Sequence, residues 1–147
     1  MCAHCNYQNL LEEAGVEPTA NRLQVLAVIG GNDAPLTAAE VFSTIERSHP
    51  INRVTVYRIL DLLVQNRVVE RISSGGRAAH FGLAPNKYHA PHPHFCCSRC
   101  GAVICLNPDS LSVDADNLQK TFAGEVSRIE VLVEGICRNC LKQRSNH

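Results

Sequence analysis

The sequence lacks long apolar runs, and no stretch approaches the roughly 20 residues that a membrane-spanning helix requires. Residues 1–5 contain neither the basic region nor the apolar core of a secretory signal. These absences predict a cytoplasmic protein with no membrane partner. The length of 147 residues and the hydrophobic content of 45% indicate one ordinary globular domain or two small ones.

An excess of positive charge is also missing, since 14 lysine and arginine residues are balanced by 14 aspartate and glutamate residues. In residues 1–84, seven basic residues stand against eight acidic residues, which gives a net charge of −1. This balance removes any general electrostatic argument for nucleic-acid binding. A DNA-binding function must therefore be argued from the positions of individual charged residues.

Cysteine, in contrast, is abundant, with eight residues in the chain. In a reducing cytoplasm this number favours metal binding over disulfides. Two CxxC pairs, Cys97 with Cys100 and Cys137 with Cys140, each offer two thiolates to one metal ion. Together they predict a closed four-cysteine zinc site, which has no free position for a substrate and is therefore structural. The alternative is a redox dithiol, but the βαβ unit that usually accompanies one is not predicted here.

Histidines gather just before the first CxxC pair. His92 and His94 are two residues apart, so a strand presents both on one face, where they can bind one ion. A turn over residues 73–77 pairs Glu70 with His80 and places these side chains side by side. A regulatory site for a second divalent metal, zinc or ferrous iron, is predicted from Glu70, His80, His92 and His94, with Cys105 joining the set or replacing one member. The alternative is a polar linker with solvated histidines.

Apolar spacing divides the chain into a helical part and a mixed part. Helices are predicted over residues 6–14, 22–29, 37–49 and 52–65, followed by strands over residues 68–72 and 79–83. Later strands are predicted over residues 92–97, 102–106 and 126–134, with a helix over residues 114–122. Short helices followed by a β-hairpin are typical of a winged helix. The interpretation is an α+β fold: a winged helix-turn-helix DNA-binding domain in residues 1–84, a hinge in residues 85–92, and an α/β dimerisation and metal-binding domain in residues 93–147.

The helix predicted over residues 52–65 has the properties of a recognition helix. Its first half, residues 52–60, contains two positive charges and no negative charge. Its polar surface carries Arg53, Thr55, Tyr57 and Arg58. Arginine can read guanine edges in a major groove, while tyrosine and threonine offer phosphate or thymine-methyl contacts. Because this helix is the last one before the hairpin, DNA contact is favoured over a merely solvated face.

These segments together resemble the ferric uptake regulator family over nearly the whole chain, from Leu11 to Cys140. The matching segments are PTANRL (18–23), TVYR (55–58), FGL (81–83), HPHFCCSRCG (92–101) and GICRNC (135–140). The resemblance implies a homodimeric repressor that binds AT-rich palindromic DNA when loaded with a divalent metal. It also implies that Tyr57 and Arg58 read DNA, and it adds Arg22 to the DNA-binding candidates. By the same likeness the four cysteines hold structural zinc, and His92 and His94 are core ligands of the sensing site.

The chain departs from the family pattern at several ligand positions. Cys105 stands where relatives commonly have an acidic residue, and Pro35 stands where many have a sensing histidine. Gly82 replaces the usual acid or cysteine of the wing, and His80, two residues earlier, is the candidate substitute. Glu70 matches the place of an aspartate or histidine ligand in zinc-sensing relatives. Softer ligands favour zinc over ferrous iron, which points to the zinc uptake regulator branch.

Other functions are compatible with the sequence. A peroxide-sensing regulator of the same family is one alternative. A zinc-stapled interaction module without a DNA role is another, and the near-neutral charge supports it. The sequence contains no HExxH motif and no H-x-E signature, so no enzymatic activity is expected. Near the N-terminus, Cys2, His4 and Cys5 form either a further metal-binding group or exposed thiols.

Overall fold

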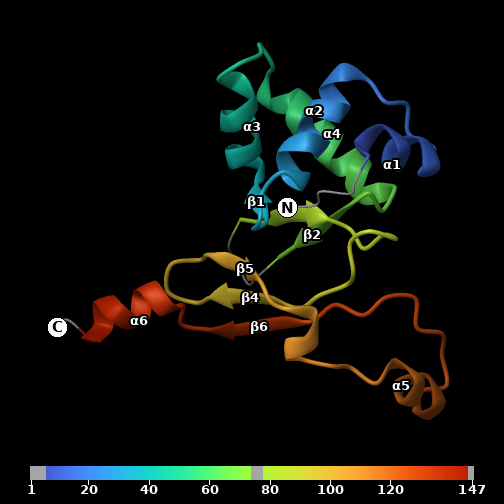
Figure 1. Ribbon diagram of the computed structural model, residues 1–147, viewed down its shortest axis with the longest axis vertical. Helices are drawn as coiled ribbons and strands as arrows, with labels where there is room; N and C mark the ends of the chain where they lie inside the picture. Colours follow the sequence, from blue (N-terminus) through green and yellow to red (C-terminus); the bar gives the residue numbers. More distant parts are fainter. Residues whose placement is uncertain (1–5, 74–77, 146–147) are drawn as a thin grey trace. The chain divides into compact units, whose positions relative to one another are not determined.

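Figure 1 shows the computed structural model of the chain, which describes residues 6–73 and 78–145. The chain divides into two compact units, residues 1–91 and residues 92–147. The first unit is mainly helical and the second is built on a mixed sheet, so the α+β fold expected from the sequence is confirmed. Within the described residues, no helix combines the length and the apolar character needed to cross a membrane.

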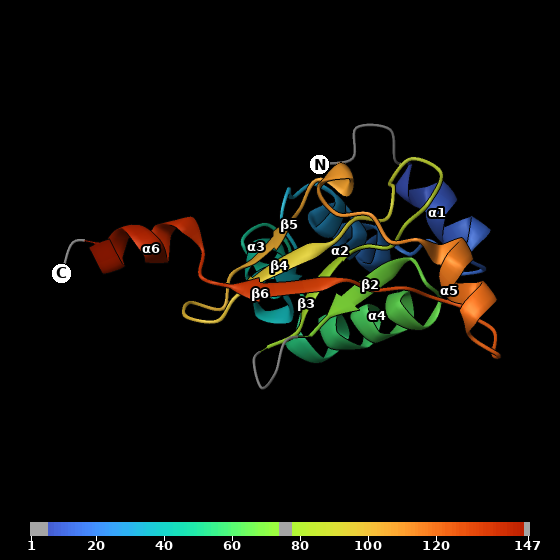
Figure 2. The same cartoon turned by 90° about the horizontal axis from the view of Figure 1, so that it is seen from below.

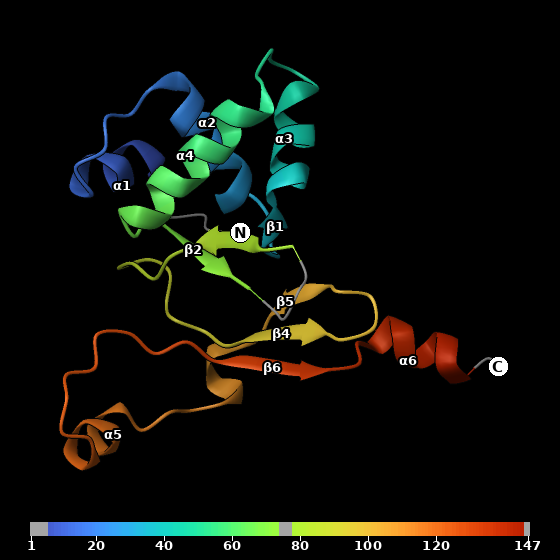
Figure 3. The same cartoon turned by 180° about the vertical axis from the view of Figure 1, so that it is seen from behind.

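The described part of the first unit combines α-helices with a small sheet. Its elements are α1 (Tyr7–Glu13), α2 (Ala20–Gly30), β1 (Leu36–Thr37), α3 (Ala38–Glu46), α4 (Arg53–Gln65), β2 (Val69–Ile72) and β3 (His80–Leu83). The sheet order is β1-β3-β2, and both pairs are antiparallel. Figures 1 and 3 show the helices together on one side of this sheet. The helices and the hairpin were expected from the sequence, whereas strand β1 was not.

Local side-chain hydrogen bonds set where the helices of the first unit begin. The Asn52 side chain accepts a hydrogen bond from the backbone amide of Thr55 at 2.8 Å and caps α4. At α3 the cap is reciprocal: the Thr37 hydroxyl accepts from the Glu40 amide at 3.2 Å, and the Glu40 carboxylate accepts from the Thr37 amide at 3.0 Å. These bonds satisfy amides that a helix start leaves without partners. Thr37 followed three residues later by Glu40 is the sequence pattern that predicts a capping box, and the structure confirms it.

An almost entirely aliphatic core holds the helices of the first unit against the hairpin. The buried members are Leu11, Val16, Val25, Leu26, Ile29, Val41, Ile45, Val56, Ile59, Leu60, Leu63, Val68, Val69, Phe81 and Leu83. Each large side chain removed from water contributes about 1.5–3 kcal/mol to folding. Helix α4 supplies four of these residues from one side, so its opposite side is left to solvent.

The β2–β3 hairpin differs from its expected register by two residues. Glu70 lies opposite Gly82, and not opposite His80 as the sequence interpretation had it. Val69 and Leu83 pair directly and are both buried, which fixes the observed register. The loop between the strands is longer than the inferred turn, and residues 74–77 of it lie outside the described residues. Because the shift is even, Glu70 and His80 stay on one face of the sheet as diagonal neighbours.

The second unit contains a mixed three-stranded sheet and short helices. Its elements are β4 (His94–Cys97), β5 (Val103–Cys105), the 3-10 helix η1 (Pro108–Ser110), α5 (Ala115–Thr121), β6 (Leu132–Gly135) and α6 (Arg138–Ser145). The order is β5-β4-β6, with β4 antiparallel to β5 and parallel to β6. Strand β6 begins at Leu132, so the strand expected over residues 126–134 was wrong in most of its length. Helix α6 was not anticipated.

Apolar side chains remain exposed on the second unit. Helix α5 buries none of its residues within the chain, and Leu118 and the adjoining Phe122 are 40% and 54% exposed. The other large apolar side chains exposed in this unit are Ile104, Leu111, Val113, Ile129, Val133 and Leu141. Figure 2 shows α5 and α6 at opposite ends of the sheet. An extended set of exposed apolar residues is typical of a surface that pairs with another chain.

Removal of the α3 capping box provides a test of this account of the first unit. We expect Thr37→Ala to lower the free energy of unfolding by about 1 kcal/mol, because the amide that Thr37 satisfies loses its partner. Ser43→Ala, at an exposed position of the same helix, is the matched control and should change it by less than about 0.5 kcal/mol. Urea unfolding of both variants measures the difference, and equal effects would contradict the assigned cap.

Candidate metal centres and nucleic-acid interface

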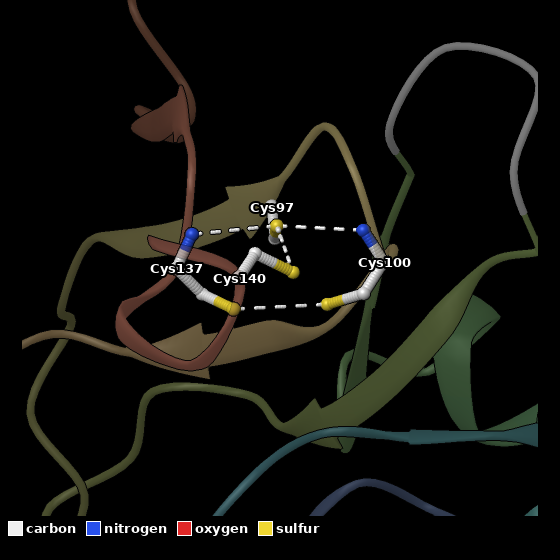
Figure 4. A group of neighbouring side chains, drawn as sticks. All are labelled: Cys97, Cys100, Cys137 and Cys140. Atoms are coloured by element: carbon white, nitrogen blue, oxygen red, sulfur yellow. Dashed lines mark hydrogen bonds between the residues drawn. The ribbon is translucent and has the colours of Figure 1, made fainter. Parts of the chain in front are cut away.

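The two CxxC turns come together because the strands that precede them run side by side in the same direction. Strand β4 ends at Cys97 and β6 ends at Gly135, and these two residues are register partners. The chain leaves both strands at the same edge of the sheet, where a turn follows β4 and helix α6 follows β6. Gly101 has a φ of +80° and closes the first turn by donating its amide to the Cys97 carbonyl at 2.9 Å. Figure 4 shows the resulting cluster of Cys97, Cys100, Cys137 and Cys140.

The spacing of the four sulfur atoms matches a tetrahedral metal site. The Sγ atoms of Cys97 and Cys140 are 3.8 Å apart, and those of Cys100 and Cys137 are also 3.8 Å apart. Sulfurs bound to zinc at about 2.3 Å in a tetrahedron lie about 3.8 Å from one another. All four sulfurs lie within 4.8 Å of one another. The expected four-cysteine cluster is therefore present, and its donor set and spacing fit a structural zinc ion.

The surroundings of the cluster shift the pKa values of two of its thiols, Cys97 and Cys140, in opposite directions. The backbone amides of Cys100 and Cys137 donate to Sγ of Cys97 at 3.4 and 3.3 Å, and these bonds lower the pKa of Cys97 to about 5. The contact with Cys137, followed by burial, raises the pKa of Cys140 to about 12. A metal must displace the proton of Cys140 to bind there. Metal affinity of the cluster should consequently fall as the pH falls.

A second cluster of metal-ligating side chains lies on the same sheet. Nitrogen atoms of His92 and His94 and the sulfur of Cys105 lie within 4.8 Å of one another. His94 and Cys105 face each other across β4 and β5. His92 precedes β4, and its ring centroid is 4.6 Å from that of His94 at an interplanar angle of 57°. The structure thus brings together three of the residues proposed from the sequence for the regulatory site: His92 and His94, which their spacing indicated, and Cys105, which was proposed to join the set or replace one member.

Burial and donor chemistry both suit this cluster for a transition metal. His94 is 4% exposed, Nε2 of His92 is shielded from solvent, and Cys105 is half-buried. Two imidazoles and one thiol form a three-ligand set with nitrogen and sulfur donors, which zinc accepts readily. Three protein ligands leave a coordination position for a further group.

The other two candidates for the regulatory site, Glu70 and His80, belong to the first unit. Both are half-buried residues of the hairpin, on one face of its sheet. A ring nitrogen of His80, Nδ1, lies 3.1 Å from the carbonyl oxygen of Ala78, which leaves Nε2 as its ligand atom. That Glu70 and His80 bind the same metal ion as His92 and His94 stays a prediction.

The surface of α4 that faces away from the core carries most of the expected DNA-binding residues. Tyr57 is 43% exposed, Arg58 is exposed, and Thr55 is half-buried. The Arg53 guanidinium lies over the ring of Phe42, 5.0 Å from the ring centroid. This cation–π contact positions the Arg53 charge from α3. The first turns of α4 therefore present an aromatic group and guanidinium groups together.

Five further residues complete the comparison with the sequence interpretation. Arg22 donates from Nη1 to the carbonyl oxygen of Glu17 at 2.9 Å, so its guanidinium also braces the chain before α2. Val54 was missed by sequence reasoning, although its place opposite the apolar stripe of α4 marks it as a surface residue. The N-terminal candidates Cys2, His4 and Cys5 lie outside the described residues.

Known proteins are similar to this chain in sequence and in fold. The sequence model of the ferric uptake regulator family matches residues 13–132 of the chain. A ferric uptake regulation protein of Bacillus subtilis (strain 168) is 27% identical over 132 residues, which cover 88% of this chain and 89% of that protein. The crystal structure of the Vibrio cholerae ferric uptake regulator matches with a TM-score of 0.71 and 24% identity, covering 90% of this chain and 100% of that one. The Helicobacter pylori ferric uptake regulator, described as having three functional metal binding sites, matches with a TM-score of 0.73 and 16% identity, covering 93% and 95%.

Substitution in the four-cysteine cluster tests its structural role. We expect Cys97→Ser to lose the bound zinc and to unfold the second unit, because zinc binding in small domains supplies roughly 10–16 kcal/mol of folding free energy. The matched control is Cys96→Ala, since Cys96 is a buried neighbour outside the cluster and its loss should leave the zinc in place. Elemental analysis and circular dichroism measure the two properties. A folded Cys97→Ser protein without metal would refute the assignment.

Proposed function

Because the chain belongs to the ferric uptake regulator family and is a metal-responsive transcription regulator and not an enzyme, we propose that it is a zinc-responsive repressor of metal homeostasis. The observation that carries the proposal is the convergence of His92, His94 and Cys105 in a unit that also contains a four-cysteine cluster. One cluster suits a permanent structural zinc. The other has an incomplete ligand set, as a metal sensor needs.

The proposed regulatory site has five members drawn from two parts of the chain. His92, His94 and Cys105 form its centre. Glu70 and His80 complete it from the β2–β3 hairpin, which is the wing of the winged helix. Glu70 and His80 share one face of the β2–β3 hairpin, which supports a joint role. A bound divalent ion supplies a cross-link between ligands that are otherwise independent.

Zinc is the proposed metal, with ferrous iron as the competing candidate. The argument rests on Cys105, because a thiolate beside two imidazoles is a softer donor set than carboxylates provide. This choice places the chain in the zinc uptake regulator branch of its family. The four-cysteine cluster is proposed to hold zinc in both the active and the inactive protein.

The proposed partner is double-stranded DNA, read through α4. Family members bind operator DNA and dimerise, and this chain is proposed to bind an AT-rich palindromic operator in the cytoplasm. Tyr57 and Arg58 are the leading base-reading residues, with Arg22, Arg53 and Thr55 in supporting contacts. The exposure of Tyr57 and Arg58 beside each other on α4 supports this role.

Homodimer formation is assigned to the second unit. Its exposed apolar side chains, including Leu118 and Phe122 around α5, offer a surface that a second copy can bury. The proposed division of labour is DNA binding by residues 1–84, a hinge in residues 85–92 and dimerisation by residues 93–147. A palindromic operator requires two recognition helices at one fixed separation, which a symmetric dimer can provide.

The proposed switch acts through the hinge. Residues of the wing and of the second unit that share one metal ion become fixed with respect to each other. The two winged helices of a dimer then spend more time at the separation that the operator requires, which is a population shift. Loss of the metal restores their independence and weakens binding.

The sensing role is tested with a variant that lacks both central histidines. We expect His92→Ala/His94→Ala protein to keep its four-cysteine zinc and its dimeric state while losing zinc-dependent operator binding. The matched control is His49→Ala, which removes an exposed histidine of the first unit and should respond to zinc as the parent does. A gel-shift titration with zinc, ferrous iron and manganese measures the response. An unchanged response in the double variant would remove these histidines from the sensor.

The DNA-reading role is tested separately with substitutions on α4. We expect Tyr57→Ala and Arg58→Ala each to weaken operator binding by about 1–3 kcal/mol, because each removes a contact in the major groove. Fold and metal content should stay unchanged, since both side chains are exposed. Arg128→Ala, which removes an exposed arginine of the second unit, is the control for lost charge. Parent-like affinity in both α4 variants would show that α4 is not the reading helix.

A further inference from the structure

Val54 is an exposed apolar residue whose position the fold does not require. It is 55% exposed, the largest fraction among the large hydrophobic side chains of the described residues. The core stripe of α4 runs along the opposite side of the helix, and Val54 takes no part in it. Valine is also a weaker helix former than the straight-chain residues usual on helix surfaces. Neither packing nor helix propensity accounts for a valine here.

The neighbours of Val54 are the residues that suit DNA. Tyr57 and Arg58 follow it by three and four residues and therefore lie beside it on the helix surface. Arg53 is held against the Phe42 ring at 5.0 Å. Val54 is thus an apolar point between an aromatic and a cationic side chain, in the first turn of α4. Recognition helices contact base edges mainly through their N-terminal residues.

We propose that Val54 is a specificity-determining residue that packs against the C5-methyl group of a thymine in the major groove. This inference rests on the proposed docking of α4 in operator DNA. Thymine alone among the four bases presents a methyl group in that groove, and apolar side chains recognise it by contact. The sequence had suggested Thr55 and Tyr57 for phosphate or thymine-methyl contacts, and Tyr57, at 43%, is less exposed than Val54. Thr55 is half-buried at the side of the helix, whereas the side chain of Val54 is 55% exposed.

The proposed contact defines a base preference at one position of each half-site. A thymine there buries its methyl group against the valine, and a cytosine offers no methyl group to bury. Because a symmetric dimer reads a palindrome, the same thymine is required twice.

The test uses full-length, zinc-loaded protein and a duplex that this protein enriches from a random pool. Each thymine of the duplex is replaced in turn by deoxyuridine, which removes the C5-methyl group and keeps the hydrogen-bonding edge. Fluorescence anisotropy gives the dissociation constants for the parent and for Val54→Ala. For the parent we expect one position per half-site at which the replacement weakens binding about fourfold, and about 15-fold when both half-sites are changed. In Val54→Ala the shortened side chain keeps only one methyl group, farther from the base, so the difference between the thymine and deoxyuridine duplexes should fall well below that of the parent.

Two further variants make the test specific to Val54. Thr55→Ser removes the methyl group of the neighbouring residue and should keep the sensitivity to deoxyuridine. Ser43→Ala changes an exposed side chain on α3 of the same unit and should behave as the parent. Circular dichroism and thermal unfolding verify that Val54→Ala is folded, as expected for an exposed position.

The possible results separate this inference from the proposed function. Undiminished methyl sensitivity in Val54→Ala, or loss of the sensitivity in Thr55→Ser, overturns the inference. A parent protein that ignores every thymine methyl group overturns it as well, while zinc-dependent operator binding in the same experiment leaves the proposed function standing. Failure of the zinc-loaded parent to enrich any duplex overturns both.

Discussion

Parallel pairing of β4 with β6 is the constraint on which the second unit depends. Parallel strands end at the same edge of a sheet, so the two CxxC turns meet only because Cys97 and Gly135 lie side by side at that edge. The four sulfurs then come within metal-binding distance of one another, and the hydrogen bonds to Cys97 favour the thiolate that a metal needs. A sheet of three short strands buries little apolar surface of its own, so a metal bound at this corner supplies folding free energy that apolar burial does not provide.

The first unit holds the outward surface of α4, the proposed DNA-binding surface, in place with a core that contains a single buried aromatic residue, Phe81. The other buried core residues are aliphatic, and the helices begin at side-chain caps that leave little freedom in where each one starts. The side of α4 that faces the core fixes the rotation of the helix, and this rotation determines that Val54, Tyr57 and Arg58 point outward. The ring of Phe42 on α3 adds a local support for Arg53. Packing on the core side of α4 therefore positions the surface that is proposed to bind DNA.

Local signals made most of this arrangement predictable from the sequence. The capping box of α3 and the apolar stripe of α4 act within a few residues, and a CxxC pair places its own two sulfurs. The β2–β3 register was wrong because a glycine-rich loop leaves its length open, and burial of Val69 opposite Leu83 decided it. Helix α6 was missed because its polar sequence has no apolar stripe. Val54 was passed over because an apolar residue within a helix is usually assigned to the core.

Strand β4 carries ligands of both metal clusters within four consecutive residues, from His94 to Cys97. An odd spacing along a strand places these two side chains on opposite faces, so each cluster is built on one side of the same short piece of backbone. The sulfur cluster anchors one end of this strand, and the histidine cluster depends on where the strand lies. A metal ion in the sulfur cluster would fix the position of β4 before the histidine cluster binds a second ion. The affinity of the histidine cluster for its metal would then depend on whether the sulfur cluster is already filled, so the order of metal binding matters.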